Sequence, residues 1–331
     1  MSKASLWTHF RKTWKPECYH GNGSAPYFEG WYYKIIDKSQ QRRMAIIPGI
    51  SFQEEDSHAF IQILDDTARR AHYIRYPVHD FHAEPDRFVV RIGDSEFQDH
   101  SFRLAIQSPD ISLKGELYLI NRFPWPVSLL SPGAMGWYGL VPLMQCYHGI
   151  LSMNHEIQGD LILDQERISF SDGRGYTEKD WGTSFPEGYV WLQCNHFQDA
   201  SVSVSCSIAR IPWVTGTFRG LLAGLLWQNR FYKFTTYSGA RVESLKLSAD
   251  SFQISLRDKT HILRLEATSS RQSDLRAPDG KSMGQRAAQG MNGTMELELR
   301  TMAGEMLVRS RGNCVAMETG GELGLILSDQ K

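Results

Sequence analysis

The sequence predicts a mostly-β protein of two domains, and three observations lead to that prediction. Aromatic and β-branched segments recur about every 8 to 12 residues with polar turns between them, as in sandwiches and barrels. Almost nowhere do apolar residues recur with a helical period over several turns. The length of 331 residues corresponds to about two domains of roughly 150 residues each.

Four segments of the first half have strand character. Residues 31–36 are aromatic and β-branched and lead into the polar turn Asp37-Lys38-Ser39-Gln40. Residues 112–119 largely alternate between apolar and polar side chains. The predicted strands of this half are 31–36, 58–64, 87–92 and 112–119.

The second half continues the same pattern. Residues 201–208 alternate strictly between serine and an apolar residue, which predicts a half-buried strand. Ala4–Trp14 is the best helix candidate of the chain. The predicted strands of this half are 201–208, 230–236, 251–257, 261–267 and 295–300.

The segment 121–152 breaks this rhythm. It is too rich in proline and glycine for regular sheet and too apolar to lie wholly in water. A segment of this kind lines or covers a binding site, or it is an ordered linker between two barrels. We expect a first domain of residues 1–160, which includes this segment, and a second domain of residues 161–331.

Composition and charge exclude several classes of protein. The formal net charge of -1 argues against a protein that binds nucleic acid through its phosphates. Five cysteines without a Cys-x-x-Cys pair, and an N-terminus without a continuous apolar stretch, predict a cytoplasmic protein. The longest apolar run, near 221–227, is far shorter than the roughly 20 residues that span a bilayer. Peripheral contact with a membrane is compatible with these features.

Three clusters concentrate carboxylates, histidines and aromatic residues. Residues 26–34 read Pro-Tyr-Phe-Glu-Gly-Trp-Tyr-Tyr-Lys. Residues 131–149 begin Ser-Pro-Gly-Ala-Met-Gly-Trp-Tyr and end Cys-Tyr-His-Gly, and residues 178–186 read Glu-Lys-Asp-Trp-Gly-Thr-Ser-Phe-Pro. At these motifs the chain resembles the tocopherol cyclase family, part of a wider group of two-lipocalin-domain proteins that includes carotenoid hydratase-related enzymes. The motifs lie in the family's order, and by general shape the resemblance covers nearly the whole chain.

The resemblance implies a fold and a reaction. The fold is two lipocalin-like antiparallel β-barrel halves packed together, with a long connection rich in proline and aromatic residues. The reaction is an intramolecular addition, as in vitamin E biosynthesis: the alkene of a prenylated hydroquinone is protonated and the phenol oxygen captures the tertiary cation, giving a chromanol. It requires neither a cofactor nor a metal, and it takes place in a pocket for a hydrophobic small molecule.

Four residues have the chemistry to move protons in that reaction. A carboxyl group among aromatic side chains has a raised pKa and can stay protonated near neutral pH. Glu29, Glu178 and Asp180 have such neighbours in the sequence. A histidine such as His148 can orient the phenol and accept its proton.

Aromatic and amide side chains near these groups are the expected substrate-binding residues. Aromatic faces stabilise cations, and hydrogen-bonding groups orient the phenol. The expected substrate-binding residues are Trp31, Tyr33, Trp137, Tyr147, Trp181, Trp191, Asn195 and His196.

Other interpretations stay open at this point. Residues 178–180 fit a solvated turn with an ion pair, and Trp31 and Trp181 fit plugs at the end of a barrel. Tyr27-x-Glu29-x-Trp31 is echoed by Tyr176-x-Glu178-x-x-Trp181, which weakly suggests a duplicated fold. A hydratase or another cyclase acting on an isoprenoid or polyketide would use the same cation, and a carrier of an apolar ligand would use the same fold. His79-x-x-His82 has a spacing that some metal sites use, but no third ligand is evident.

Overall fold

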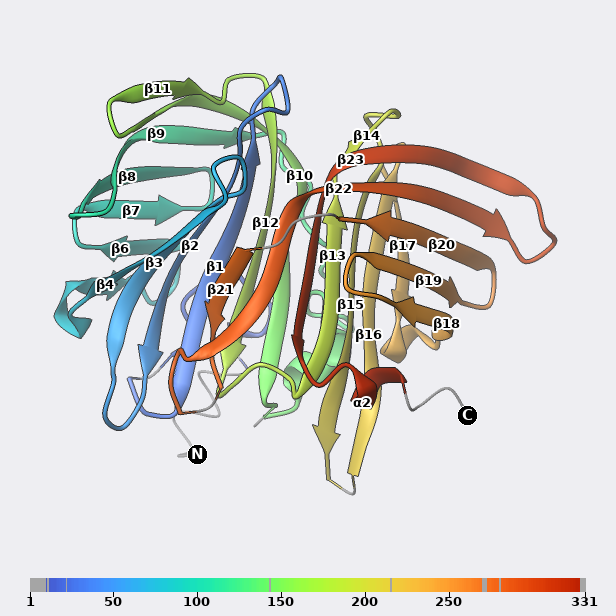
Figure 1. Ribbon diagram of the computed structural model, residues 1–331. Helices are drawn as coiled ribbons and strands as arrows, with labels where there is room; N and C mark the ends of the chain where they lie inside the picture. Colours follow the sequence, from blue (N-terminus) through green and yellow to red (C-terminus); the bar gives the residue numbers. More distant parts are fainter. Residues whose placement is uncertain are drawn as a thin grey trace. The chain divides into compact units, whose positions relative to one another are not determined.

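The computed structural model describes residues 10, 12–21, 23–142, 144–214, 216–269, 273–279 and 281–327. The chain divides into two compact units. Unit 1 contains Met1–Phe185 and Leu275–Gln285, and unit 2 contains Pro186–Asp274 and Arg286–Lys331. Nearly all regular structure is antiparallel strand, so the mostly-β prediction is confirmed (Figure 1).

Unit 1 is built on one antiparallel sheet. Its strands follow the order β4-β3-β2-β1-β12-β10-β9-β8-β7-β6-β5, and β11 pairs with β10 outside this path. The elements are β1 (Tyr27–Ile36), β2 (Arg43–Phe52), β3 (His58–Asp65), β4 (Arg70–Tyr76), η1 (Val78–Asp80), β5 (Phe81–Ala83), β6 (Val89–Ile92), β7 (Ser95–Gln98), β8 (Ser101–Gln107), β9 (Ser112–Ile120), η2 (Gly136–Leu140), β10 (Cys146–Leu163), β11 (Glu166–Ser169) and β12 (Gly173–Gly182).

The sheet of unit 1 curls around its own apolar core. Trp31 of β1 stacks on Phe88, just before β6, with ring centroids 5.6 Å apart. Tyr33 of β1 contacts Phe102 of β8 at 5.1 Å. These strands are distant in the sheet order, so their side chains meet only because the sheet bends back on itself. This arrangement agrees with the lipocalin-like expectation.

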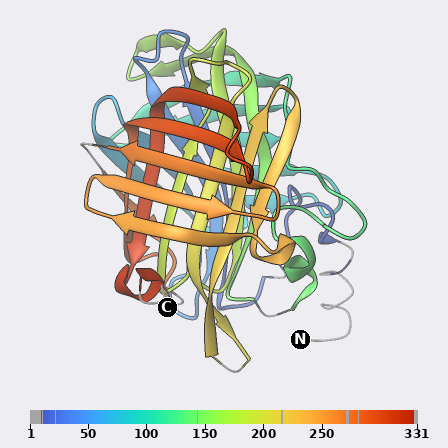
Figure 2. The ribbon, with the colours of Figure 1, turned by 90° about the vertical axis from the view of Figure 1, so that its right-hand side faces the viewer.

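Unit 2 is built on a second antiparallel sheet, which Figure 2 shows nearly face-on. Its strands follow the order β17-β16-β15-β13-β23-β22-β20-β19-β18, with β14 beside β23. The strand β21 pairs with β22 and crosses the boundary between the units after Asp274. Its inward side chains form one apolar cluster that includes Leu192, Phe234, Phe252 and Leu297. The elements are β13 (Gly188–Cys194), β14 (His196–Phe197), β15 (Ser203–Trp213), β16 (Gly216–Trp227), β17 (Arg230–Thr235), η3 (Thr236–Ser238), β18 (Arg241–Leu247), β19 (Ser251–Arg257), β20 (His261–Thr268), β21 (Ser273–Ala277), β22 (Gln285–Thr301), β23 (Met306–Gly321) and α2 (Gly324–Leu327).

Every strand predicted from the sequence overlaps an observed one, but the boundaries differ in two places. The compact units divide after Phe185 rather than after residue 160, because β12 pairs with β1 and β10 of the first sheet. The segment 121–152 joins β9 to β10 inside unit 1, and its last residues belong to β10, where we had expected irregular structure.

Two expectations from the sequence concerned helices: a helix at Ala4–Trp14, and the absence of an apolar stretch long enough to span a bilayer. Most of the predicted helix Ala4–Trp14 lies outside the described residues. Among the residues that the structure describes, no helix is long and apolar enough to cross a membrane.

Candidate active site

Strand β12 separates the charged residues of the third motif into two clusters. Successive side chains of a strand point to opposite faces. Glu178 and Asp180 therefore share one face, and Lys179 and Trp181 share the other. Lys179 is completely buried and Glu178 is 6% exposed, so the interpretation of residues 178–180 as a solvated turn is wrong.

The register of the sheet adds partners to each face. Glu29 of β1 lies opposite Trp181, and Trp31 lies opposite Lys179. On the other side of β12, His148 of β10 lies opposite Asp180. Residues opposite each other on antiparallel strands have neighbouring side chains. The first motif thus meets the third on the face of Lys179 and Trp181, and the second motif meets it on both faces, through Tyr147 opposite Trp181 and His148 opposite Asp180.

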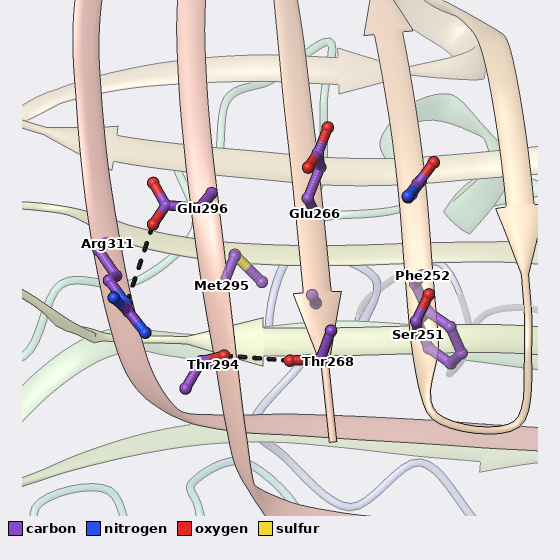
Figure 3. A pocket seen from close by; sticks show the side chains of 10 residues that line it. Ser251, Phe252, Glu266, Thr268, Thr294, Met295, Glu296 and Arg311 are labelled. Atoms are coloured by element: carbon purple, nitrogen blue, oxygen red, sulfur yellow. Dashed lines mark hydrogen bonds and ion pairs between the residues drawn. The ribbon is translucent and has the colours of Figure 1, made fainter. Parts of the chain in front are cut away.

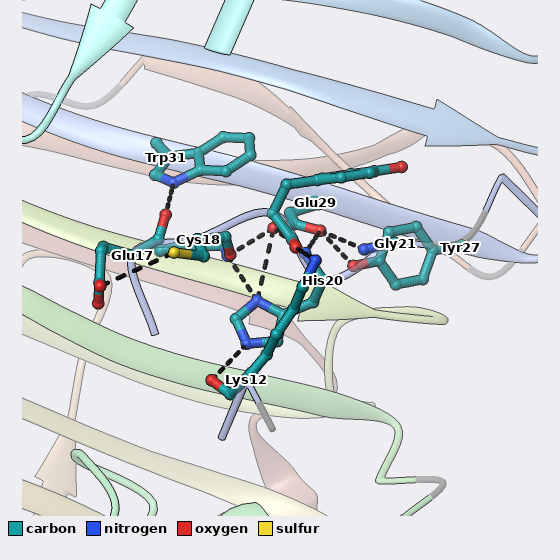
Figure 4. Close-up of polar contacts among 10 residues, drawn as sticks. Lys12, Glu17, Cys18, His20, Gly21, Tyr27, Glu29 and Trp31 are labelled. Atoms are coloured by element: carbon teal, nitrogen blue, oxygen red, sulfur yellow. Dashed lines mark hydrogen bonds and ion pairs between the residues drawn. The ribbon is translucent and has the colours of Figure 1, made fainter. Parts of the chain in front are cut away.

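Glu29 is held as a buried carboxylate (Figure 4). It accepts hydrogen bonds from the backbone N–H groups of His20, at 3.0 Å, and Gly21, at 3.1 Å, and from the Tyr27 hydroxyl. Its Oε1 also lies 2.5 Å from Lys179 Nζ. Burial raises the pKa of Glu29, but Lys179 and His20 outweigh burial and lower it to about 2. Glu29 therefore has no proton to give near neutral pH.

Lys179 has an equally complete set of partners. Its amine donates to the Cys18 carbonyl and to His20 Nδ1, at 2.8 Å. It lies 4.8 Å from the ring centre of Trp31 and 4.7 Å from that of Trp181. Burial and Lys179 lower the pKa of His20 to about 4, so His20 is neutral. Since the unprotonated Nδ1 accepts from Lys179, the remaining ring proton is on Nε2, which donates to the Lys12 carbonyl at 3.2 Å.

Trp181 lies in a stack of three rings. His20 stacks on it at 4.3 Å and Tyr147 at 5.4 Å between ring centres. A Cβ at Gly149 would meet Pro16 at 2.9 Å, so the glycine of the Cys-Tyr-His-Gly motif leaves room for Pro16 beside this stack. The Tyr147 hydroxyl donates to the Val141 carbonyl at 2.8 Å, which ties together two residues of the segment 121–152.

The other face of β12 holds a histidine between two carboxylates. His148 Nδ1 lies 2.8 Å from Asp180 Oδ1, and His148 Nε2 lies 3.7 Å from Glu178 Oε2. Tyr176 donates a hydrogen bond of 2.5 Å to Glu178. Burial lowers the pKa of His148, but Asp180 and Glu178 more than compensate and raise it to about 9. At neutral pH this imidazole carries a proton on each nitrogen.

The two nitrogens of His148 are in different situations. Nδ1–H is bonded to Asp180, which fixes the orientation of the ring. Nε2 is buried and makes no hydrogen bond. The donor atoms of His148, Glu178 and Asp180 lie within 4.8 Å of one another, which is close enough for a metal ion. The direct hydrogen bond between His148 and Asp180, however, pairs two of these donors with each other and favours a proton at this point.

A small cavity adjoins both clusters. One part of it is lined by His20, Tyr147, His148 and Trp181, and another part by residues 132–135. Its volume of about 10 Å³ accommodates roughly one water molecule. This cavity is too small for a ring-bearing ligand.

The expected substrate-binding residues do not all gather here. Trp31 and Tyr33 lie in the core of unit 1, and Trp137 lies on η2 with 44% of its surface exposed. Trp191, Asn195 and His196 belong to unit 2, where all three are buried. Tyr147 and Trp181 are the members of this set that line the cavity.

A larger hollow of about 200 Å³ lies on the outer surface of unit 2 (Figure 3). Thr268 and Thr294 bridge neighbouring strands there at 3.1 Å, and Glu296 lies 3.9 Å from Arg311. Cross-strand pairs of this kind are typical of a solvated sheet face. None of the expected site residues lines this hollow.

Sequence reasoning missed His20, Tyr27 and Lys179 as members of the site. Lys179 was treated only as a partner in a surface ion pair. The alternation of β12 would have identified its separate face, because residues 178 and 180 point one way and residues 179 and 181 the other. For His20 no sequence signal existed, since it lies outside the motifs and reaches Glu29 through the backbone.

Comparison with known proteins points to one family. The model of the family described as tocopherol cyclase-like matches residues 123–321. A chloroplastic tocopherol cyclase from Zea mays is 28% identical over 197 residues, which are 56% of this chain and 41% of that protein. A probable chloroplastic tocopherol cyclase from Oryza sativa subsp. japonica is 26% identical over 197 residues, 56% of this chain and 42% of that protein. The matched region thus spans about two fifths of these relatives' length.

Solved structures share the fold over nearly the whole chain. The crystal structure of CghA matches with a TM-score of 0.59 and 9% identity, covering 90% of this chain and 89% of that one. A putative AttH from Nitrosomonas europaea matches with a TM-score of 0.51 and 13% identity, covering 89% and 92%. Kievitone hydratase from Nectria haematococca matches with a TM-score of 0.50 and 10% identity, covering 89% of each chain. At these identities the likeness concerns the fold alone.

Proposed function

The chain belongs to the tocopherol cyclase-like family, and from this premise we propose that it is an acid-catalysed cyclase acting on a prenylated hydroquinone. The proposed reaction adds the phenol O–H across the alkene of the prenyl tail and gives a chromanol of unchanged mass. In class it is an isomerase, an intramolecular lyase that needs no cofactor. The observation that carries the proposal is His148, which is protonated between two carboxylates with one nitrogen free of hydrogen bonds.

We assign the proton donation to His148 Nε2. The proton passes to the less substituted alkene carbon, and a tertiary cation forms on its neighbour. The phenol oxygen attacks this cation and forms the new C–O bond. The phenolic proton then returns to Nε2, so the site regains the proton that it gave. Asp180 keeps the ring oriented through Nδ1, and Glu178 offsets the positive charge of the cation.

The cluster around Glu29 has a different role in this proposal. Glu29 has a pKa of about 2 and Lys179 is its ion-pair partner, so neither is assigned a proton-transfer step. They hold Trp181 and Tyr147 as one wall of the site. A fixed apolar wall brings the phenol oxygen close to the alkene and keeps water from capturing the cation.

A mass-resolved assay of the purified protein with a prenylated hydroquinone, kept reduced, tests the proposal. We expect a product of unchanged mass and shifted retention, and a loss of about 10²–10⁴-fold in kcat/KM for His148→Gln. His58→Gln is the matched control, because His58 is also buried and bonded but lies on β3 outside the site. Thermal unfolding of both variants separates lost chemistry from lost fold.

Other outcomes of this assay would redirect the assignment. A product heavier by one water would identify a hydratase. Substrate that binds but returns unchanged would indicate a carrier, and in that case His148→Gln should leave the affinity for the ligand near the wild-type value.

A further inference from the structure

The segment 123–147, here called the apolar segment, contains no Asp, Glu, Lys or Arg. Several of its large side chains nevertheless lie in water. Leu129 is 82% exposed and Leu130 is 87% exposed, and Val127 is 46% exposed. Single exposed leucines are common, but two adjacent ones within an uncharged segment are a feature of the surface that needs a partner.

The two leucines project from a closed turn. Ser128 N–H donates to the Ser131 carbonyl at 3.0 Å, and Ser131 N–H donates to the Ser128 carbonyl at 3.1 Å. Trp14 Nε1 donates to the same Ser128 carbonyl at 3.2 Å and holds the turn against the N-terminal part of the chain. The backbone groups of Ser128 and Ser131 at the base of the turn are thus satisfied within the protein, so only the backbone of the tip needs the hydrated headgroup region for its hydrogen bonds.

The other side of the apolar segment reaches the site. Pro132, Gly133 and Met135 line the cavity together with His148 and Trp181. The exposed tip and the cavity wall are thus consecutive parts of one stretch of chain. A displacement of the tip would move residues 132–135, which close the cavity.

We infer that the Leu129–Leu130 tip docks on the surface of a lipid bilayer, with both side chains in the boundary between headgroups and acyl chains. The segment offers no charged side chain to pair with an acidic or basic partner, and its apolar tip fits an uncharged lipid surface. A tip of two leucines is far smaller than the roughly 1,200–2,000 Å² that a stable protein–protein interface buries. If the proposed function holds, the apolar substrate reaches the site from the membrane past this segment.

Binding to vesicles of phosphatidylcholine alone, measured by co-sedimentation without substrate, tests the inference. We expect wild-type protein to bind and Leu129→Ser/Leu130→Ser to bind at least about tenfold more weakly, because two leucines lose their burial in lipid. Binding should also be insensitive to salt, since only charge-mediated docking is screened. Met302→Ser is the control: Met302 is an apolar side chain, 44% exposed, in the turn between β22 and β23 of unit 2.

Each of three results would overturn the inference. They are absence of wild-type binding, equal binding by the double variant, and an equal loss in Met302→Ser. Turnover of substrate in vesicles and in detergent micelles then separates this inference from the proposed function. If Leu129→Ser/Leu130→Ser loses turnover in vesicles but keeps it in micelles, delivery of the substrate from the membrane is supported. If neither preparation is turned over, the cyclase assignment fails while the vesicle result stands by itself.

Discussion

The two faces of β12 hold charged clusters of similar composition, but the hydrogen bonds that their members make are very different. On one face Glu29 and Lys179 meet at 2.5 Å, and each has further hydrogen-bond partners. On the other face His148 is bonded to Asp180 through one nitrogen, while the other nitrogen makes no hydrogen bond. Glu29 and Lys179 are thus held by each other and by several hydrogen bonds, whereas His148 Nε2 lies 3.7 Å from Glu178 and makes no hydrogen bond. On this difference rests our proposal that one face has a structural role and the other a role in proton transfer.

The largest expected effect is on folding. Lys179→Met would leave the Glu29 carboxylate buried without its cation and should lower the free energy of unfolding by roughly 3–5 kcal/mol. Urea unfolding measures this loss. Adding Glu29→Gln to Lys179→Met should restore part of the lost stability, because the orphaned charge is then removed. If Lys179→Met were as stable as wild type, the structural role of this face would be wrong.

The next effect concerns the rate and its dependence on pH. His148 must be protonated to act, so turnover should stay constant below its pKa of about 9 and fall as the pH rises through that value. Asp180 is a main cause of the raised pKa. Asp180→Asn should therefore shift the fall in activity to lower pH, in addition to lowering the rate. Glu187→Gln, outside the described contacts of His148, is the control for a general change of charge. An unshifted profile in Asp180→Asn would rule out His148 as the titrating donor.

Stability at low pH tests the opposite face. The pKa of Glu29 is lowered from 4.5 to about 2, so the folded state prefers the ionised form. The resulting stability is fully present above about pH 4.5 and is lost as the pH falls toward 2. The free energies of unfolding of wild type and Glu29→Gln, measured with urea, should therefore approach each other as the pH falls over this range. A difference that does not change with pH would show that Glu29 stabilises the fold without its charge.

The smallest expected effect is that of the aromatic wall. Trp181→Phe keeps an aromatic ring, but the smaller ring overlaps less with His20 and Tyr147 and makes a weaker contact with the Lys179 amine. We expect a loss of about 0.5–2 kcal/mol in the free energy of unfolding. If this variant changed KM more than kcat, that result would indicate that the ring also contacts the substrate. Stability equal to that of the wild type would instead show that the indole makes no net contribution.

The sequence was a good guide to the architecture because alternating apolar and polar residues predict a strand. Residues 203–208 of the predicted strand 201–208 lie within β15. Ser203 and Ser205 are as buried as Val204 and Cys206, so the strand was predicted correctly, but its description as half-buried was wrong. Where apolar residues follow one another on both faces of a buried strand, this alternation disappears. In β13, Gly188–Cys194, every residue is buried, and no strand was predicted there.

The site was predicted less completely because it depends on pairing between distant strands. The motifs identified Glu29, His148 and Asp180, but only the register of β1, β12 and β10 distributes them over two faces. The sequence echo between Tyr27-x-Glu29 and Tyr176-x-Glu178 also depends on which strands are neighbours, because the two stretches belong to β1 and β12, which pair with each other. It joins neighbouring strands of one sheet, so it is not a sign of two duplicated halves.

The most direct test of the central claim is turnover in D₂O, with the product examined by mass spectrometry. If a proton held on His148 is added to the alkene, the chromanol from wild-type protein gains one deuterium on carbon, and His148→Gln forms almost none of this product. A chromanol without deuterium on carbon, or labelled product formed at the wild-type rate by His148→Gln, would contradict the account.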